Sequence, residues 1–146
     1  MKSRQKGTAI VEFALVLPLL LLLTMITTEF GRAIYQYNTI VKSLRDATRY
    51  LSVQTPNTKV TEAKNLVVFG NIAGTGTALV PGLSVSQVSI PLWVPTGSNP
   101  VINTVKVTVT GYKFHSLFTS VFGVTFGDVS GDIPYGPISA AMRGSS

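Results

Sequence analysis

Residues 7–31 read GTAIVEFALVLPLLLLLTMITTEFG, and this stretch decides how the chain is built. Residues 9–28 are mostly apolar, and no charged residue occurs from residue 13 to residue 28. About 20 helical residues span about 30 Å, the thickness of a bilayer's hydrocarbon core. The stretch therefore predicts a transmembrane helix over residues 8–28.

The residues on either side of this span predict its orientation. Lys2, Arg4 and Lys6 precede it and supply half of the formal net charge of +6. Cations before a span favour a cytoplasmic N-terminus, which places the rest of the chain outside. A secretory signal peptide is the competing interpretation, but residues 29–32, EFGR, make a poor cleavage site after the span.

Glu12 lies only three residues into the apolar run. A carboxylate inside a membrane costs a few kcal/mol unless it is paired or close to the interface. One interpretation is an interfacial acid that water reaches. The other takes Glu12 together with Gly7, because a basic leader, a glycine and a glutamate five residues later resemble the type IV prepilin signal. This resemblance implies cleavage by a prepilin peptidase between Gly7 and Thr8, and pairing of Glu12 with the N-terminal amine of a neighbouring subunit.

Three motifs narrow the resemblance. VEFALVLP (residues 11–18), EFGRA (29–33) and RDATRY (45–50) together resemble the TadE-like family of the tight-adherence (Tad/Flp) pilus system. These proteins are minor pilins, also called pseudopilins, that support pilus assembly. The resemblance covers the first 52 residues closely. It implies other pilin subunits and a pilus assembly platform as partners.

The helical pattern continues beyond the membrane over residues 29–54. Positions spaced alternately by four and three residues form a stripe on one face of the helix, which packs on the chain's own sheet or on a neighbouring helix. The stripe consists of Phe30, Ile34, Tyr37, Val41, Leu44, Thr48 and Leu51. We take its first five members as a candidate subunit interface and add Trp93 from a proline-rich loop. Pro18 and Gly31 are candidate hinges of the long helix.

Residues 55–146 are expected to form an exported α+β domain. A short helix over residues 61–69 is followed by a loop rich in glycine and then by a period of two, which predicts strands. The strands are expected at 83–90 with a bulge near 86–87, at 101–110, at 125–130 and at 138–143. No long helix separates them, so the sheet is antiparallel and packs on the long helix.

Residues that could carry chemistry are few. His115 is the only histidine, and no nucleophile motif places it with Ser116 and Asp128. Asp128 and Asp132 flank a glycine and are weak candidates for a cation site, although a turn is the better interpretation. Cysteine is absent, and the basic residues form no stripe with aromatics, so we expect no enzyme, no cofactor, no nucleic acid and no small-molecule substrate.

The prediction is a minor pilin-like subunit with a leader at residues 1–7, cleaved after Gly7. It is a single-pass protein of the bacterial inner (cytoplasmic) membrane, with its C-terminal domain outside, at the pilus or cell surface once assembled. The alternative is an uncleaved single-pass anchor with an exported binding domain.

Overall fold

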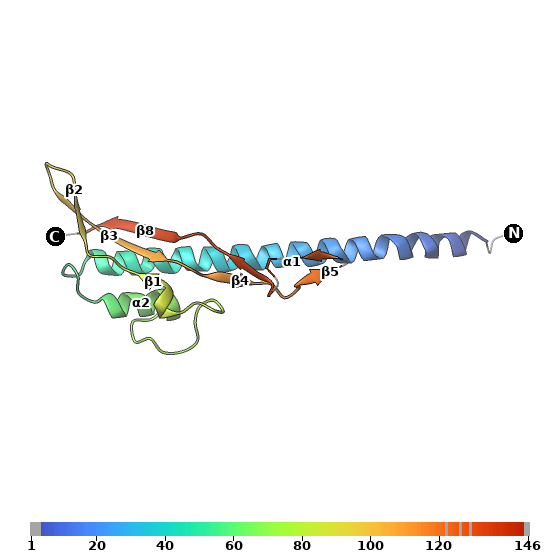
Figure 1. The fold of residues 1–146 in the computed structure, drawn as a ribbon, viewed down its shortest axis with the longest axis horizontal. Coiled ribbons are helices and arrows are strands. Elements are labelled where there is room, and N and C mark those ends of the chain that lie inside the picture. The colour runs from blue at the N-terminus through green and yellow to red at the C-terminus, as the bar shows by residue number, and fades with distance from the viewer. Residues whose placement is uncertain (1–3, 122, 126, 129, 145–146) are drawn as a thin grey trace.

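A computed structural model describes residues 4–121, 123–125, 127–128 and 130–144. One helix of 49 residues, α1 (Arg4–Ser52), runs the length of the molecule, and a small domain covers only its C-terminal part (Figure 1). The other elements follow in chain order: α2 (Val60–Phe69), η1 (Val85–Gln87), β1 (Val88–Ser89), β2 (Val94–Thr96), β3 (Ile102–Val109), β4 (Lys113–His115), β5 (Ser120–Val121), β6 (Val124–Thr125), β7 (Asp132–Pro134) and β8 (Ile138–Arg143).

Helix α1 is continuous because its sequence is rich in leucine and other helix formers. The threonines near the end of the apolar span bond their own helix: the Thr24, Thr27 and Thr28 hydroxyls donate to carbonyls four residues earlier, each at 2.8 Å. Their hydroxyls are thereby satisfied without water. The helix ends at Ser52, shortly before Pro56, which cannot continue it.

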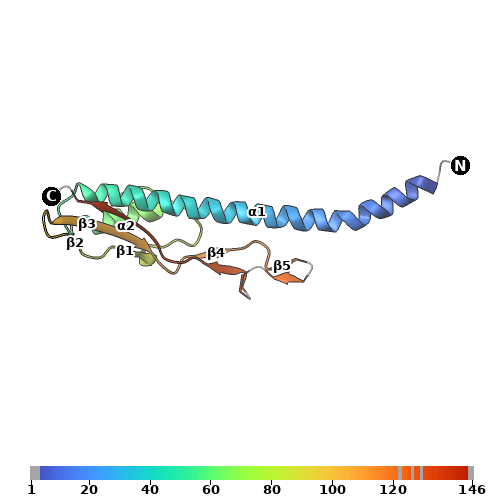
Figure 2. The ribbon, with the colours of Figure 1, turned by 90° about the horizontal axis from the view of Figure 1, so that it is seen from above.

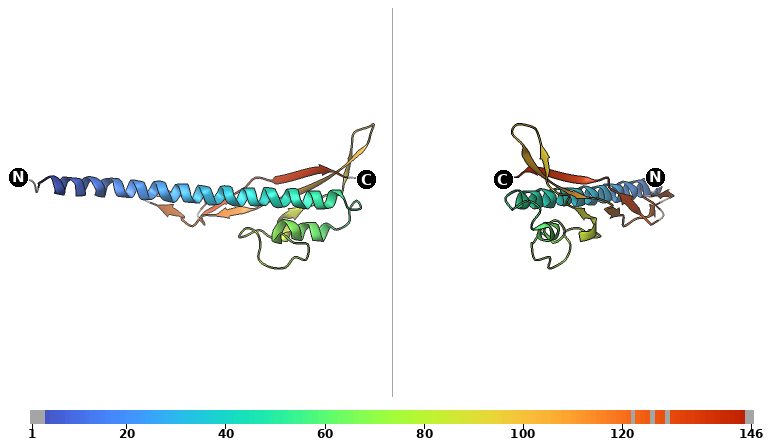
Figure 3. Two further views of the ribbon diagram at one scale, coloured as in Figure 1. Left: turned by 180° about the vertical axis from the view of Figure 1, so that it is seen from behind. Right: turned by 60° about the vertical axis from the view of Figure 1, so that its left-hand side comes forward.

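Helix α2 agrees with the predicted second helix to within one residue. It ends at Phe69 and is capped by Gly70, whose φ of 73° is left-handed and whose amide donates to the Leu66 carbonyl at 3.0 Å. Helix α2 and the sheet flank the C-terminal half of α1 (Figure 3).

Strand β3 is the centre of the main sheet. Strand β8 pairs with one side of it, with Val107 opposite Ala140, while β1 and β2 share the other side. All of these pairs are antiparallel. The fold is therefore α+β, a long helix packed on a small antiparallel sheet, as the sequence predicts.

The core lies between α1, α2 and this sheet. Alternate residues of β3 face it, because side chains of a strand alternate between its two faces. The fully buried set on the strand is Val105, Val107 and Val109. The matching row on α1 is Ile40, Leu44, Ala47 and Leu51.

The second part of the domain is an arm, which we define as the described residues between 112 and 135. It contains the antiparallel pair β4–β7 and the hairpin β5–β6. The arm runs beside α1 toward the N-terminus of that helix (Figures 1 and 2).

Two predicted strands differ from the structure. The first half of the strand expected at 83–90 is the 3-10 turn η1, because the Gln87 side chain accepts from the Ser84 amide at 2.9 Å and closes the turn locally. The strand expected at 125–130 continues only to Thr125 in β6; residues 126 and 129 lie outside the described part. Gly127 has a φ of 80°, and a Cβ there would come within 2.7 Å of the Asp132 carbonyl oxygen, so a tight turn replaces the strand.

The predicted stripe on α1 is correct only in its C-terminal half. Leu44, Thr48 and Leu51 are buried, whereas Phe30 and Ile34 are exposed. A straight helix of 3.6 residues per turn drifts by about 20° per heptad relative to a 3.5-residue repeat. Near residue 30, therefore, the residues of α1 that face the domain are not those of the predicted stripe. They are Glu29 and Gln36, which are both buried.

Candidate functional site

The N-terminal half of α1 is the only described segment with the length and composition of a membrane span. From residue 7 to residue 28 every residue is exposed except Leu22 and Met25, which are half-buried. Leu15 and Leu19 keep 76% and 67% of their surface exposed. Burying one leucine is worth about 1.5–3 kcal/mol, so a surface of this kind belongs in lipid or against other helices.

Gly7 and Thr8, the predicted cleavage site, lie in the first turns of α1. Gly7 is exposed, and a Cβ atom on it would meet no atom within 4 Å. A glycine inside a helix costs about 1 kcal/mol relative to alanine. Packing and helix formation therefore give no reason for a glycine here, and cleavage stays a prediction.

Glu12 lies one helical turn after Thr8, and its side chain is exposed. The ion pairs among side chains that the structure describes do not include it. Pairing of Glu12 with a neighbouring subunit stays a prediction.

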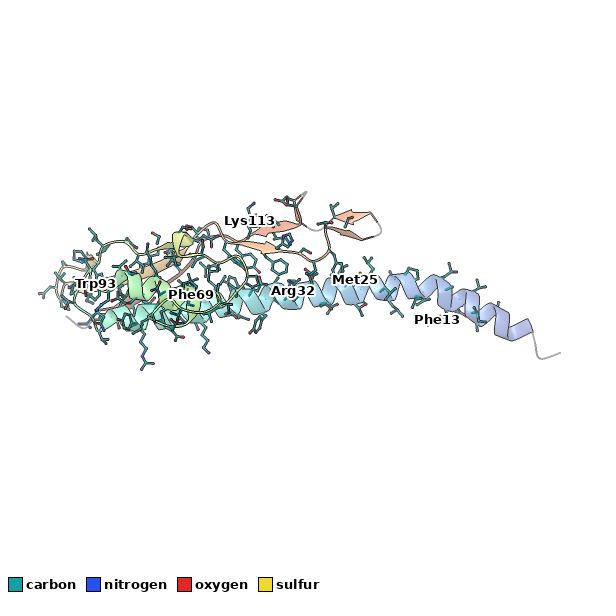
Figure 4. All side chains as sticks on the ribbon, turned by 90° about the horizontal axis from the view of Figure 1, so that it is seen from below. Phe13, Met25, Arg32, Phe69, Trp93 and Lys113 are labelled. Atoms are coloured by element: carbon teal, nitrogen blue, oxygen red, sulfur yellow. The ribbon has the colours of Figure 1, made fainter. Side chains whose placement is uncertain are left out.

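The two candidate hinges differ in what surrounds them. Helix α1 changes direction between the labelled Phe13 and Met25, the interval that contains Pro18 (Figures 2 and 4). Proline removes one backbone hydrogen bond and crowds the preceding turn, which is the usual cause of a bend. Gly31 lies on an exposed face where a Cβ would meet nothing within 4 Å, and the helix continues through it.

The candidate interface residues divide into two groups. Phe30, Ile34 and Tyr37 keep 67%, 45% and 46% of their surface exposed, and Val41 is half-buried. Leu44 is a correction: its exposure is 0%, because it fills the core between α1 and the rest of the domain. The exposed group continues the apolar surface of the span past residue 28.

Trp93 lies at the end of the domain farthest from the span (Figure 4). Its ring packs against the core and close to Gly144, where a Cβ would approach the ring to 2.1 Å. Its neighbours Leu92 and Val94 are more exposed, at 74% and 57%. Trp93 therefore has a packing role within the chain, and a role between subunits stays a prediction.

Glu29, at the end of the apolar span, holds the arm to α1. Its exposure is 6%, and its Oε1 accepts from Arg32 Nη1 at 2.6 Å. Its Oε2 accepts from the Leu117 amide at 3.2 Å and lies 3.0 Å from the Ser116 hydroxyl. We call these four residues the Glu29 junction. The buried carboxylate is thus paired and hydrogen-bonded on both oxygens, which is the condition for burying a charge.

Two tyrosines fasten the arm to the next turns of α1. The Tyr135 hydroxyl donates to the Ala33 carbonyl at 2.8 Å, and the Tyr112 hydroxyl lies 2.8 Å from Gln36 Oε1. Burial raises the pKa of Tyr112 to about 12 and also raises the pKa of Tyr135, so both hydroxyls stay protonated donors at neutral pH. Glu29, Ala33 and Gln36 follow one another at spacings of four and three, which places all three on one face of α1.

The residues considered for catalysis are held apart. The His115 Nδ1 atom lies 3.0 Å from Asp132 Oδ1, whereas the adjacent Ser116 faces Glu29. The Asp128 carboxylate accepts from the Ser130 and Asp132 amides at 2.8 and 3.0 Å, and these bonds lower its pKa.

The pair Asp128 and Asp132 does come together at the turn, as the sequence predicts. Lys113 Nζ lies 3.9 Å from Asp128 and 3.5 Å from Asp132, so a lysine already occupies the position between the two carboxylates. Within the described residues no group of three or more potential metal ligands is present. The arrangement is that of an ion-paired turn.

Sequence reasoning missed the Glu29 junction, although EFGRA contains two of its members. Glu29 and Arg32 have the spacing of a helical ion pair. Ser116 lies 87 positions from Glu29, so only the fold brings them together.

The comparisons with known proteins bear on the helix alone. Residues 7–49 match the family described as TadE-like protein, which is associated with Tad pili. This confirms the resemblance for the N-terminal helix. No curated protein and no solved structure matches the chain significantly.

Proposed function

We propose, from the match of its N-terminal helix to the TadE-like family, that this chain is a minor pilin- or pseudopilin-like structural subunit. It supports the assembly of a tight-adherence-type pilus and catalyses no reaction. Helix α1 holds it in the bacterial inner membrane, with the N-terminus in the cytoplasm and the domain outside. Assembly carries it toward the pilus or the cell surface.

The observation that carries this proposal is the contrast between the two halves of α1. The C-terminal half fills the core with Ile40, Leu44, Ala47 and Leu51. The N-terminal half has no partner surface over most of residues 7–28, yet it is the most apolar part of the described chain. A domain complete in itself that carries a long unpaired apolar helix suits a subunit that assembles through that helix.

The proposed mechanism has three steps. The span inserts, a prepilin peptidase cuts between Gly7 and Thr8, and the shortened helix packs against other pilin subunits on the assembly platform. The new amine of Thr8 in one subunit pairs with Glu12 of its neighbour. A carboxylate that is costly in lipid when alone becomes tolerable beside an ammonium, so pairing favours assembly. The exposed Phe30, Ile34 and Tyr37 extend the contact beyond the membrane.

The intact mass of the membrane-extracted chain, made with and without a prepilin peptidase, tests the cleavage. We expect the mass to fall by that of residues 1–7 only when the peptidase is present. Gly7→Val is the matched control, and we expect it not to be cleaved. A side chain at position 7 meets no other atom within 4 Å, so a loss of cleavage would show that the peptidase requires the glycine rather than that the chain has misfolded. A full-length mass in both preparations contradicts the pilin pathway and leaves an uncleaved anchor with an exported binding domain.

Glu12→Ala tests the assembly step separately. We expect this variant to be made, inserted and cleaved as the parent chain is, but to be absent from the assembled pilus fraction. Normal incorporation of Glu12→Ala would remove the pairing step from the mechanism.

A further inference from the structure

The hairpin β5–β6 occupies an unusual place for part of an exported domain. Leu117, just before it, donates its amide to Glu29, the first charged residue after the apolar span. From this point the hairpin lies farther toward the N-terminus of α1 than β4 does (Figures 1 and 2). It therefore lies beside the last turns of the span rather than above them.

The half-buried residues of α1 mark the same overlap. Leu22 and Met25 are the only residues from 7 to 28 that are half-buried; the others are exposed. They share one face of the helix with Glu29, at spacings of three and four, and Met25 lies on the arm side in Figure 4. Seven residues from Leu22 to Glu29 correspond to about 10 Å along the helix axis.

The sequence of this segment suits lipid contact. Residues 116–127 read SLFTSVFGVTFG and contain no charged residue. Leu117 keeps 65% of its surface exposed although it is fastened at its amide. Charged residues gather at the base of the segment instead, where Lys113 and His115 face Asp128 and Asp132. An exposed leucine on the side nearest the span, with the charged residues on the side away from it, is the arrangement expected at a membrane interface.

We infer that the hairpin β5–β6, together with Leu117 before it, enters the lipid interface beside α1, so that the chain contacts the bilayer through the hairpin as well as through its helix. The backbone limits the depth. The hairpin is two-stranded among the described residues, so it leaves unpaired edge groups that the hydrocarbon core would not satisfy. It therefore stays within about 10 Å of the boundary, where headgroups and water still reach the backbone.

This inference rests on the proposed insertion of α1, and cysteine labelling separates the two. The chain has no cysteine, so single variants can be reconstituted in vesicles of phosphatidylethanolamine and phosphatidylglycerol at low protein density. The variants are Leu117→Cys in the segment, Leu20→Cys in the span and Leu92→Cys at the far end of the domain. Leu92 is the matched control, since its exposure of 74% is close to that of Leu117.

A membrane-impermeant maleimide is the probe, and labelling in detergent defines the total. We expect Leu117→Cys to react about tenfold more slowly than Leu92→Cys in vesicles, because lipid covers an apolar side chain there. After denaturation in sodium dodecyl sulfate we expect the two variants to be labelled to the same extent, because the folded arrangement that places Leu117 beside the span is then lost.

Two results would overturn the inference. Equal labelling of Leu117→Cys and Leu92→Cys in vesicles, with Leu20→Cys protected, means that the span inserts and the hairpin does not. Protection of Leu117→Cys that grows with protein density means that a second copy, not lipid, covers the segment. Rapid labelling of Leu20→Cys would instead contradict the membrane anchor itself.

Discussion

At the scale of single residues, Glu12 and Glu29 stand near the two ends of the apolar span in opposite surroundings. Glu12 is exposed on a helix with no domain beside it. Glu29 is buried, with Arg32 on one oxygen and the arm on the other. The second carboxylate therefore acts within the folded chain, whereas pairing of the first with another subunit stays a prediction.

Replacing Glu29 should loosen the arm without unfolding the domain. Glu29→Ala leaves the Arg32 guanidinium and the Leu117 amide without this acceptor, and it leaves the Ser116 hydroxyl with the Phe118 carbonyl alone. Hydrogen bonds to a charged group are worth about 1.5–3 kcal/mol, which corresponds to roughly 10- to 150-fold faster local opening. Hydrogen exchange of the Ser116 and Tyr135 amides measures this opening, because their own acceptors, the Gly131 and Tyr112 carbonyls, are unchanged.

Glu12→Ala is the control for this experiment. It removes a carboxylate of the same helix that has no bond to the arm, so the two amides should exchange at the parent rate. Unchanged exchange in Glu29→Ala would mean that the tyrosine contacts at Ala33 and Gln36 hold the arm by themselves.

The contacts of the Glu29 junction cannot be predicted from the sequence around Glu29. Glu29 follows an apolar run, which marks it as interfacial, but its partners are separated from it by most of the domain. Gly7 and Glu12 can be singled out from the sequence because their spacing is local, and their role stays a prediction. The difference is one of contact order: short spacings are visible in a sequence, and long-range pairings require the fold.

At the scale of elements, a local sequence pattern predicts a helix or strand correctly when no competing side-chain bond or turn interrupts it. Strands β3 and β8 follow from clean alternation or from a bounded run, and α2 from its glycine cap. The run at residues 83–87 also alternates, but the Ser84 and Gln87 bond competes with strand pairing and closes a turn. Short strands such as β5 and β6 carry too little pattern to be predicted.

The corrected core row of α1 can be tested by a pair of substitutions on that helix. Leu44→Ala should lower the free energy of unfolding by about 2–5 kcal/mol, because it opens a cavity in a packed core. Ile34→Ala should change it by less than about 1 kcal/mol, since Ile34 is 45% exposed. Urea unfolding of the full chain in detergent, followed through the fluorescence of Trp93, measures both changes. Equal losses of unfolding free energy in the two variants would mean that Ile34 and Leu44 are buried on the same face, as the predicted stripe requires.

At the scale of the whole molecule, the apolar residues form two separate surfaces. One is closed: its buried members run from Ile40 to Ile138 and are covered by the chain itself. The other is open and covers residues 7–28 of α1. The bend in α1 lies in the open part, before the Glu29 junction (Figures 2 and 4). The C-terminal half of α1 thus stabilises the domain, and its N-terminal half is the part suited to attach the chain to a membrane.

This separation predicts that the domain folds without the span. A chain of residues 27–146 keeps the Glu29 junction and every buried apolar residue of the core, so it should be a monomer that needs no detergent. Its far-ultraviolet circular dichroism should differ from that of the full chain only by the lost helix, and light scattering coupled to gel filtration measures its mass in solution. Aggregation would mean that the exposed Phe30 face or the hairpin requires cover even when the span is gone. Adding phosphatidylglycerol vesicles then separates these causes: lipid would disperse aggregates formed through the hairpin, whereas aggregates formed through the Phe30 face would persist until another subunit is supplied.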